Sequence, residues 1–233
     1  MKLRERIIVA LDTPDFFLCK KWVRSLKGLV SFFKIGSELF TSTGTQSVQY
    51  VLDQGGEVFL DLKFHDIPNT VAQVSKAVAD LGIKMFNVHA LGGLAMMRAA
   101  KEAVPTHTGA PWILGVTVLT SLSEEELSGE LGIKVSLKNE VLHLAKLAKR
   151  AGLNGVVASA QEVSMIKKTL GREFKVVTPG IRPRWSVKGD QHRVVTPREA
   201  FGLGADYIVI GRPITGASDL RQAASKVIEE VES

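Results

Sequence analysis

Eight short apolar runs alternate along the chain with longer stretches that carry a helical pattern. The runs are rich in β-branched residues and lie at residues 7–11, 30–35, 58–62, 85–89, 113–119, 155–158, 174–178 and 207–210. Between them, apolar residues recur every three or four positions, as in Val71, Val74 and Val78. Strands that alternate with helices pair in parallel through right-handed crossovers. The pattern predicts an α/β fold, with a (β/α)8 TIM barrel as the expected architecture and a doubly wound open sheet as the main alternative.

The length and composition of the chain fit one domain. Its 233 residues are 45% hydrophobic, which is enough to bury one large core. No low-complexity tract or long Pro/Ser-rich linker interrupts the sequence, so we expect residues 1–233 to form a single barrel domain. The apolar run at residues 7–11 is too short to span a membrane and lacks a signal-peptide cleavage pattern, so we expect a cytoplasmic protein without membrane contact. Cys19 is the only cysteine, which excludes an intrachain disulfide.

The chain is basic, with a net charge of +6 and a sequence pI of about 9.4. Its lysines and arginines are scattered rather than gathered in one long run, and aromatic residues make up only 6% of the chain. Nucleic-acid binding usually shows a basic stripe with interleaved aromatic residues. We therefore expect no nucleic-acid partner and interpret the charge as solvated surface together with a site for an anionic small molecule.

Polar residues follow most of the predicted strands, whereas the strand interiors are apolar. In a barrel, the carboxyl ends of the strands and the loops after them carry the active site. The polar residues at these ends are Asp12, Lys34, Asp61, Lys63, Thr120, Arg182 and Arg212, and Gly211 precedes Arg212 after the eighth strand. Several charges that converge on one face of a barrel are better explained by a catalytic site than by an ordinary charged surface.

At the end of the third predicted strand, two carboxylates bracket a lysine. Because strand side chains alternate between faces, Asp61 and Lys63 share one face and Leu62 takes the other. Adjacent carboxylates such as Asp61 and Asp66 favour the charged form of a lysine, since one pair at ~4 Å and an effective dielectric of ~20 interacts by ~4 kcal/mol. The alternatives are a plain ion pair at a strand end and, for Asp66, a cap on the helix that begins near Pro68.

Residues 61–70, with the sequence DLKFHDIPNT, resemble the signature of the orotidine 5′-phosphate decarboxylase family. Further motifs of that family appear in the family's order at residues 9–12, 33–36, 178–183, 189–191 and 210–213. The resemblance implies a (β/α)8 barrel that forms a homodimer. It also implies cofactor-free conversion of orotidine 5′-phosphate to UMP and carbon dioxide, the last step of de novo pyrimidine synthesis.

The resemblance also assigns roles to residues of this sequence. It implies that Lys63 donates a proton to C6 of the pyrimidine, within an array that continues through Asp61 and Lys34. It implies that each subunit contributes one short segment to the site of its partner. The residues of that shared segment are Asp66, Ile67 and Thr70. The expected substrate contacts are Asp12 and Lys34 on the ribose, Thr120 on the base, and Arg182, Gln191, Gly211 and Arg212 on the phosphate and the loop that closes over it.

Two other functions fit parts of the same pattern. A 3-keto-L-gulonate 6-phosphate decarboxylase shares the Asp-x-Lys-x-x-Asp spacing but uses Mg²⁺, and it requires a carboxylate at the end of the second strand, where this chain has Lys34. A non-catalytic nucleotide-binding barrel would not require a buried array of charges. The sequence shows no metal-ligand spacing, so we expect no metal site.

Several other conspicuous residues receive structural interpretations. We expect His65 to point away from the charged pair. For His89, at the end of the fourth strand, we favour a structural role over a place in the lining of the pocket. Met96 and Met97 are typical of a helix core. The run of glutamates at residues 124–126 follows Ser123 and predicts a capped helix start rather than a metal site.

Overall fold

Eight parallel strands form a closed barrel at the centre of the molecule. The computed structural model describes residues 2–186 and 195–232. Each strand pairs with the next one along the chain, and β8 pairs with β1. The strands are β1 (Ile7–Ala10), β2 (Phe32–Gly36), β3 (Glu57–Phe64), β4 (Met85–His89), β5 (Trp112–Val116), β6 (Gly155–Val157), β7 (Lys175–Thr178) and β8 (Tyr207–Ile210). The barrel prediction is confirmed, and the open sheet is excluded by the β1–β8 pairing.

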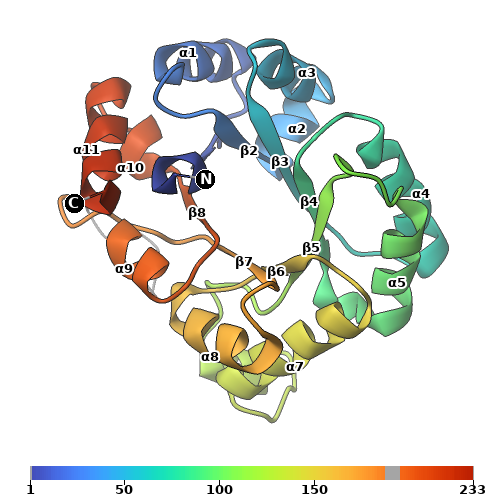
Figure 1. Ribbon diagram of the computed structural model, residues 1–233. Helices are drawn as coiled ribbons and strands as arrows, with labels where there is room; N and C mark the ends of the chain where they lie inside the picture. Colours follow the sequence, from blue (N-terminus) through green and yellow to red (C-terminus); the bar gives the residue numbers. More distant parts are fainter. Residues whose placement is uncertain (1, 187–194, 233) are drawn as a thin grey trace.

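Helices surround the barrel as an outer ring (Figure 1). The α-helices are α1 (Phe16–Leu26), α2 (Ser37–Thr43), α3 (Gln46–Asp53), α4 (Pro68–Ala79), α5 (Gly93–Ala103), α6 (Glu124–Gly129), α7 (Leu137–Arg150), α8 (Ala160–Leu170), α9 (Pro197–Gly202), α10 (Arg212–Thr215) and α11 (Leu220–Glu232), and the 3-10 helices are η1 (Leu3–Arg6) and η2 (Ala90–Gly92). Local sequence explains their starts: Pro68 occupies the first turn of α4, and Ser123 caps α6, both as predicted. Among the described residues, no helix combines the length and the apolar character that crossing a bilayer requires.

Two predicted strands differ from the observed ones in a way that affects the site. β3 continues to Phe64, two residues beyond the predicted end at Leu62, so Lys63 as well as Asp61 lies inside the strand. β5 ends at Val116, three residues before the predicted end at Leu119. Beyond this end, Val118, Leu119 and Thr120 line a cavity at the barrel mouth instead of continuing the β5 ladder.

The barrel has an apolar interior that is separate from the larger core between strands and helices. The interior cluster consists of Ile8, Ala10, Phe32, Phe59, Met85, Leu114, Val177, Tyr207 and Val209. Since side chains two residues apart on a strand share a face, each strand also presents its next alternate residue to the barrel interior. In this way Ala10 is followed by Asp12, Phe32 by Lys34 and Phe59 by Asp61. The apolar cluster thus forms the floor beneath a charged layer.

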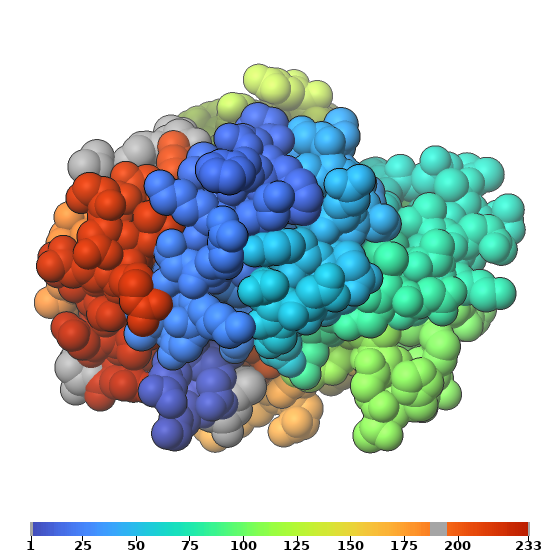
Figure 2. All heavy atoms as spheres, turned by 90° about the horizontal axis from the view of Figure 1, so that it is seen from above, coloured from blue at the N-terminus to red at the C-terminus, as the bar shows by residue number. Residues whose placement is uncertain are grey.

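The two ends of the described chain meet where the barrel closes. Arg6 donates from Nε to the Asp206 carbonyl oxygen at 2.6 Å and from Nη2 to the Ala205 carbonyl oxygen at 2.5 Å. Arg221 of α11 donates to the Ser25 carbonyl oxygen at 2.7 Å. Figure 2 shows the N-terminal residues, in blue, directly beside the C-terminal helices, in red. These contacts hold the start of β8 beside the start of β1, at the amino ends of the two strands.

Candidate active site

Four charged side chains form a continuous row across the carboxyl ends of β1, β2 and β3. The Lys34 ammonium lies 2.8 Å from Asp12 Oδ1 and 3.4 Å from Asp61 Oδ2. Asp61 Oδ1 in turn lies 2.7 Å from the Lys63 ammonium. The predicted contact between Asp61 and Lys63 is present, with Leu62 packed against the outer core on the opposite face. Lys34 extends the row, as expected, and Asp12 ends it.

The centre of this row is buried and stays ionised. The Lys34 and Asp61 side chains are only 11% and 13% exposed. Burial by itself lowers the pKa of Lys34, but the charges of Asp61 and Asp12 outweigh it, so the pKa is raised above the ordinary lysine value. Burial by itself raises the pKa of Asp61, but Lys34 and Lys63 reverse that effect, so the pKa lies below the ordinary aspartate value. Lys34 and Asp61 therefore hold each other in the charged form.

A further polar residue, Asn87 of β4, belongs to the site and was not predicted from the sequence. Its side chain is completely buried. Asn87 Nδ2 donates to Asp61 Oδ1 at 2.7 Å, and Asn87 Oδ1 accepts from the Lys63 backbone N–H at 2.8 Å. The only sequence signal is a single amide in the middle of the apolar run at residues 85–89.

Two adjoining cavities open beside the charged row. The smaller, of about 160 Å³, is lined by Lys34, Phe59, Asp61, Lys63, Val116, Val118, Leu119, Thr120, Val157, Ala158, Pro179 and Val209. The larger, of about 440 Å³, is lined by Ala10, Asp12, Lys34, Glu38, Pro179, Gly180, Ile181, Arg182, Val209, Gly211, Arg212 and Thr215. Both share Lys34, Pro179 and Val209. The smaller cavity has apolar walls that suit a flat ring, and the larger has two arginines that suit an anion.

The predicted shared segment does not reach these cavities within its own chain. Asp66 and Ile67 are exposed on the connection between β3 and α4, and Thr70 is half-buried in the first turns of α4. Asp66 Oδ1 accepts from the Ile67 backbone N–H at 2.6 Å. The N-cap of α4 is Ile67, which makes no side-chain cap hydrogen bond, so the alternative that Asp66 caps this helix is wrong. Gln191 lies outside the described residues.

The two histidines near the row stack on each other. The rings of His65 and His89 are 5.3 Å apart between centroids and inclined by 21°. Burial, with smaller effects from His65 and Lys63, lowers the pKa of His89 to about 4, so His89 is neutral at neutral pH. Neither ring lines the two cavities. This arrangement agrees with the structural roles expected for both residues.

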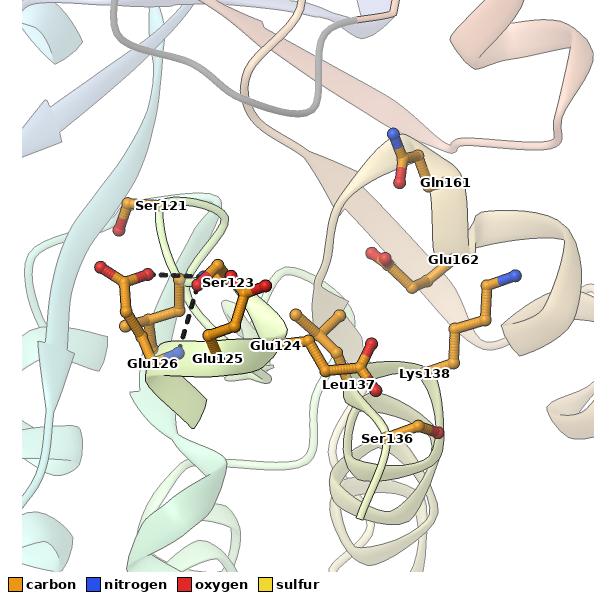
Figure 3. A pocket seen from close by; sticks show the side chains of 11 residues that line it. Ser121, Ser123, Glu124, Glu125, Glu126, Ser136, Leu137, Lys138, Gln161 and Glu162 are labelled. Carbon is orange, nitrogen blue, oxygen red and sulfur yellow. Dashed lines mark hydrogen bonds between the residues drawn. The ribbon is translucent and has the colours of Figure 1, made fainter. Parts of the chain in front are cut away.

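A larger hollow, of about 760 Å³, lies between α6 and the starts of α7 and α8 (Figure 3). Glu126, one of the acidic residues that line it, takes part in the cap of α6. Ser123 Oγ accepts from the Glu126 backbone N–H at 3.2 Å, and Glu126 Oε2 accepts from the Ser123 backbone N–H at 2.7 Å. This reciprocal cap is the predicted helix start. Within residues 2–186 and 195–232, no three His, Cys, Asp or Glu side chains gather to ligate one metal ion. Size alone therefore does not identify the functional cavity.

Comparisons with known proteins agree with the motifs at the strand ends. Residues 5–227 match the family model described as "Orotidine 5'-phosphate decarboxylase / HUMPS family". The chain is 49% identical to an orotidine 5′-phosphate decarboxylase from Syntrophotalea carbinolica, over 99% of this chain and 96% of that protein. It is 52% identical to one from Carboxydothermus hydrogenoformans, over 99% and 97%. A crystal structure of the Lactobacillus acidophilus enzyme superposes with a TM-score of 0.86 at 40% identity, covering 98% of this chain and all of that chain.

The ionisation of Asp61 predicts a pH-dependent stability difference. Because its folded-state pKa is lowered, Asp61 contributes stability that is fully present above the ordinary aspartate pKa of about 4 and is lost as pH falls through the folded-state value. We expect Asp61→Asn to reduce the free energy of unfolding by about 3 kcal/mol at pH 7, because two ammonium groups lose their shared partner. The difference from the parent should shrink at pH 3, measured by urea unfolding at both pH values.

The matched control is Glu57→Gln on the same strand. Glu57 and Lys84 form a pair at 3.0 Å whose side chains are 45% and 40% exposed. Exposed pairs of this kind contribute about 0–1 kcal/mol. If Asp61→Asn cost no more than this control, or cost the same at pH 3 as at pH 7, the stabilising role of the buried carboxylate would be disproved.

Proposed function

This chain belongs to the orotidine 5′-phosphate decarboxylase / HUMPS family, and from that premise we propose that it converts orotidine 5′-phosphate to UMP and carbon dioxide in de novo pyrimidine synthesis. The observation that carries the proposal is the row from Asp12 to Lys63, which runs along both the ring-sized and the anion-sized cavity. Binding alone does not require such a buried array. A reaction that develops charge in the site does.

The two cavities divide the substrate between them. The pyrimidine fits the smaller cavity, against Thr120, and the phosphate fits the larger one, beside Arg182 and Arg212. Gly211 and Arg212 lie after β8 at the start of α10, the region of a barrel where phosphate sites are frequent. Gln191, which lies outside the described residues, is kept as a proposed contact on the phosphate side because of the family resemblance alone.

The ribose then lies beside Asp12 and Lys34, the two residues of the row that line the larger cavity. Asp12 and Lys34 are hydrogen-bonded at 2.8 Å, and both line this cavity. Their oxygen and nitrogen atoms suit the two ribose hydroxyls as acceptor and donor. Binding energy from the phosphate and ribose is thereby available to order the reacting end of the site.

Lys63 carries the chemical step. When the bond between C6 and the carboxylate breaks, the electron pair stays on C6 in the plane of the ring, where the ring π-system stabilises it poorly. The Lys63 ammonium stabilises this charge and then donates a proton to C6, and carbon dioxide leaves. Lys63 regains its proton from solvent before the next turnover.

Asp61 serves the same step in two ways. Its carboxylate lies 2.7 Å from the Lys63 ammonium and keeps that group oriented. It also lies on the side of the ring where the substrate carboxylate is bound. Repulsion between the two carboxylates raises the energy of the bound substrate and disappears as neutral carbon dioxide forms.

The shared segment completes the site in a homodimer. Asp66 and Ile67 follow Lys63 by only a few residues and project outward, and the Ile67 side chain is 65% exposed. An exposed isoleucine beside an exposed carboxylate suits insertion into a neighbouring copy. With Thr70, these residues would extend the partner's row of alternating charges through Asp66.

The metal-dependent alternative is disfavoured by the residue at the end of β2. Lys34 occupies the position where that enzyme requires a carboxylate, and its ammonium contacts both Asp12 and Asp61. A cation held there repels a divalent metal ion.

The purified protein should therefore decarboxylate orotidine 5′-phosphate equally well with and without EDTA. The measurement is the near-ultraviolet absorbance change that accompanies loss of the C6 carboxylate. Activity that EDTA abolished and Mg²⁺ restored would overturn the cofactor-free assignment. Binding of UMP without release of carbon dioxide would instead identify a non-catalytic barrel.

Replacement of the proton donor should separate chemistry from binding. We expect Lys63→Ala to lower kcat by more than about 10⁴-fold, since it removes both charge stabilisation and the proton. Affinity for UMP should stay close to that of the parent, because UMP already carries a hydrogen at C6. The control is Lys84→Ala, which removes an exposed ion pair at the amino ends of β3 and β4, away from the carboxyl ends that carry the site. Substantial residual turnover in Lys63→Ala would refute the assignment.

Mixing two inactive variants tests the shared site. Asp66→Ala and Lys63→Ala subunits, refolded together in equal amounts, should recover about a quarter of the parent activity, because half of the dimers are mixed and each has one intact site. Each variant alone supplies the baseline. Confirmed heterodimers without recovered activity would show that Asp66 does not act across the interface.

A further inference from the structure

Asn87 is held at the one place where the ladder between β3 and β4 is irregular. The two strands pair regularly up to Leu60 and Phe86, and the next pair is Phe64 with Val88. Three residues of β3, at positions 61–63, therefore face one residue of β4, which is Asn87. A bulge of this kind re-aims side chains and leaves backbone groups without ladder partners.

Within this bulge, Lys63 has a strained backbone conformation. Its φ is +52°, and among the described residues it is the only non-glycine with a positive φ. This left-handed conformation costs a residue with a side chain about 1–2 kcal/mol, so it persists only where surrounding contacts enforce it. The hydrogen bond from the Lys63 N–H to Asn87 Oδ1, at 2.8 Å, is such a contact.

The other end of the same amide fixes the carboxylate partner of Lys63. Asn87 Nδ2 donates to Asp61 Oδ1 at 2.7 Å, and the Lys63 ammonium donates to that same oxygen at 2.7 Å. The amide, the lysine backbone, the lysine side chain and the carboxylate thus form a closed ring of contacts. Because Asn87 is completely buried, rotation of the amide would leave these groups without partners at a cost.

We propose that Asn87 is a positioning residue that holds the Lys63 ammonium in its reactive place by bonding both the Lys63 backbone and the Asp61 carboxylate. The proposal rests on the role proposed for Lys63. Without the amide, Lys63 is free to relax to a negative φ, which swings its Cβ and ammonium away from the point that C6 occupies. A displacement of about 1 Å can cost 10²-fold in rate. Asn87 itself does not line the substrate cavities.

Two variants separate the two bonds of the amide. Asn87→Ala removes both. Asn87→Asp keeps the volume and the acceptor for the Lys63 N–H, but it loses the donor to Asp61 and adds a like charge beside it. We expect each variant to lower kcat by about 100-fold or more, with affinity for UMP changed by less than about threefold.

Asn154→Ala is the matched control for a purely structural amide. Asn154 Oδ1 accepts from the Ile113 backbone N–H at 2.9 Å, so it also joins neighbouring strands, but it precedes β6 at the opposite end of the barrel. Asn154→Ala should lower the melting temperature about as much as Asn87→Ala and leave kcat of the folded enzyme unchanged.

The outcomes distinguish this inference from the proposed function. Near-parent kcat in either folded Asn87 variant would overturn the positioning role. So would losses of kcat and UMP affinity in equal proportion. If the parent released no carbon dioxide, or if Lys63→Ala remained active, the proposed function or the role of Lys63 would fail first. A structure of Asn87→Ala would then still test the inference, since an unchanged positive φ at Lys63 would refute it.

Discussion

The buried carboxylate of Asp61 is the interaction on which the rest of the site depends. It receives hydrogen bonds or charge contacts from Lys34 on β2, Lys63 on β3 and Asn87 on β4. A carboxylate removed from water costs several kcal/mol unless such partners surround it. Its burial is therefore tolerated only where three neighbouring strands end in register. The closed barrel supplies that register, and the apolar floor beneath supplies the low dielectric that strengthens each contact.

Most of this layer could be predicted because barrel geometry follows from local rules. Alternation along each strand places Lys34 above Phe32 and Asp61 above Phe59, and both pairs are visible in the sequence alone. Parallel pairing then brings the ends of β2 and β3 together, as the pairing of Gly36 with Asp61 shows. Strand-end charges in a chain that predicts a barrel are for this reason informative without any structure.

What could not be predicted depends on contacts between distant segments. Asn87 interrupts an apolar run in the way that many structural asparagines do, and its importance comes from a bulge in a different strand. That bulge requires Lys63 to adopt a positive φ, which sequence propensity disfavours. The proposed shared segment has the same difficulty in another form. Asp66 and Ile67 are exposed in a single chain, and the residues that they are proposed to contact belong to a second copy.

The row of charges also depends on a residue that contributes no chemistry. A Cβ atom at Gly36 would lie 2.9 Å from Lys34 Nζ and 3.3 Å from Asp12 Oδ1. A side chain at this position would force the Lys34 ammonium to shift from its place between the two carboxylates. Because Lys34 lines both cavities, this space also connects the cavity proposed for the phosphate and ribose with the cavity proposed for the pyrimidine. Displacement of this one ammonium would therefore change the lining of both cavities and weaken the ionisation of Asp61, so in the proposed mechanism substrate binding and the chemical step are linked through Lys34.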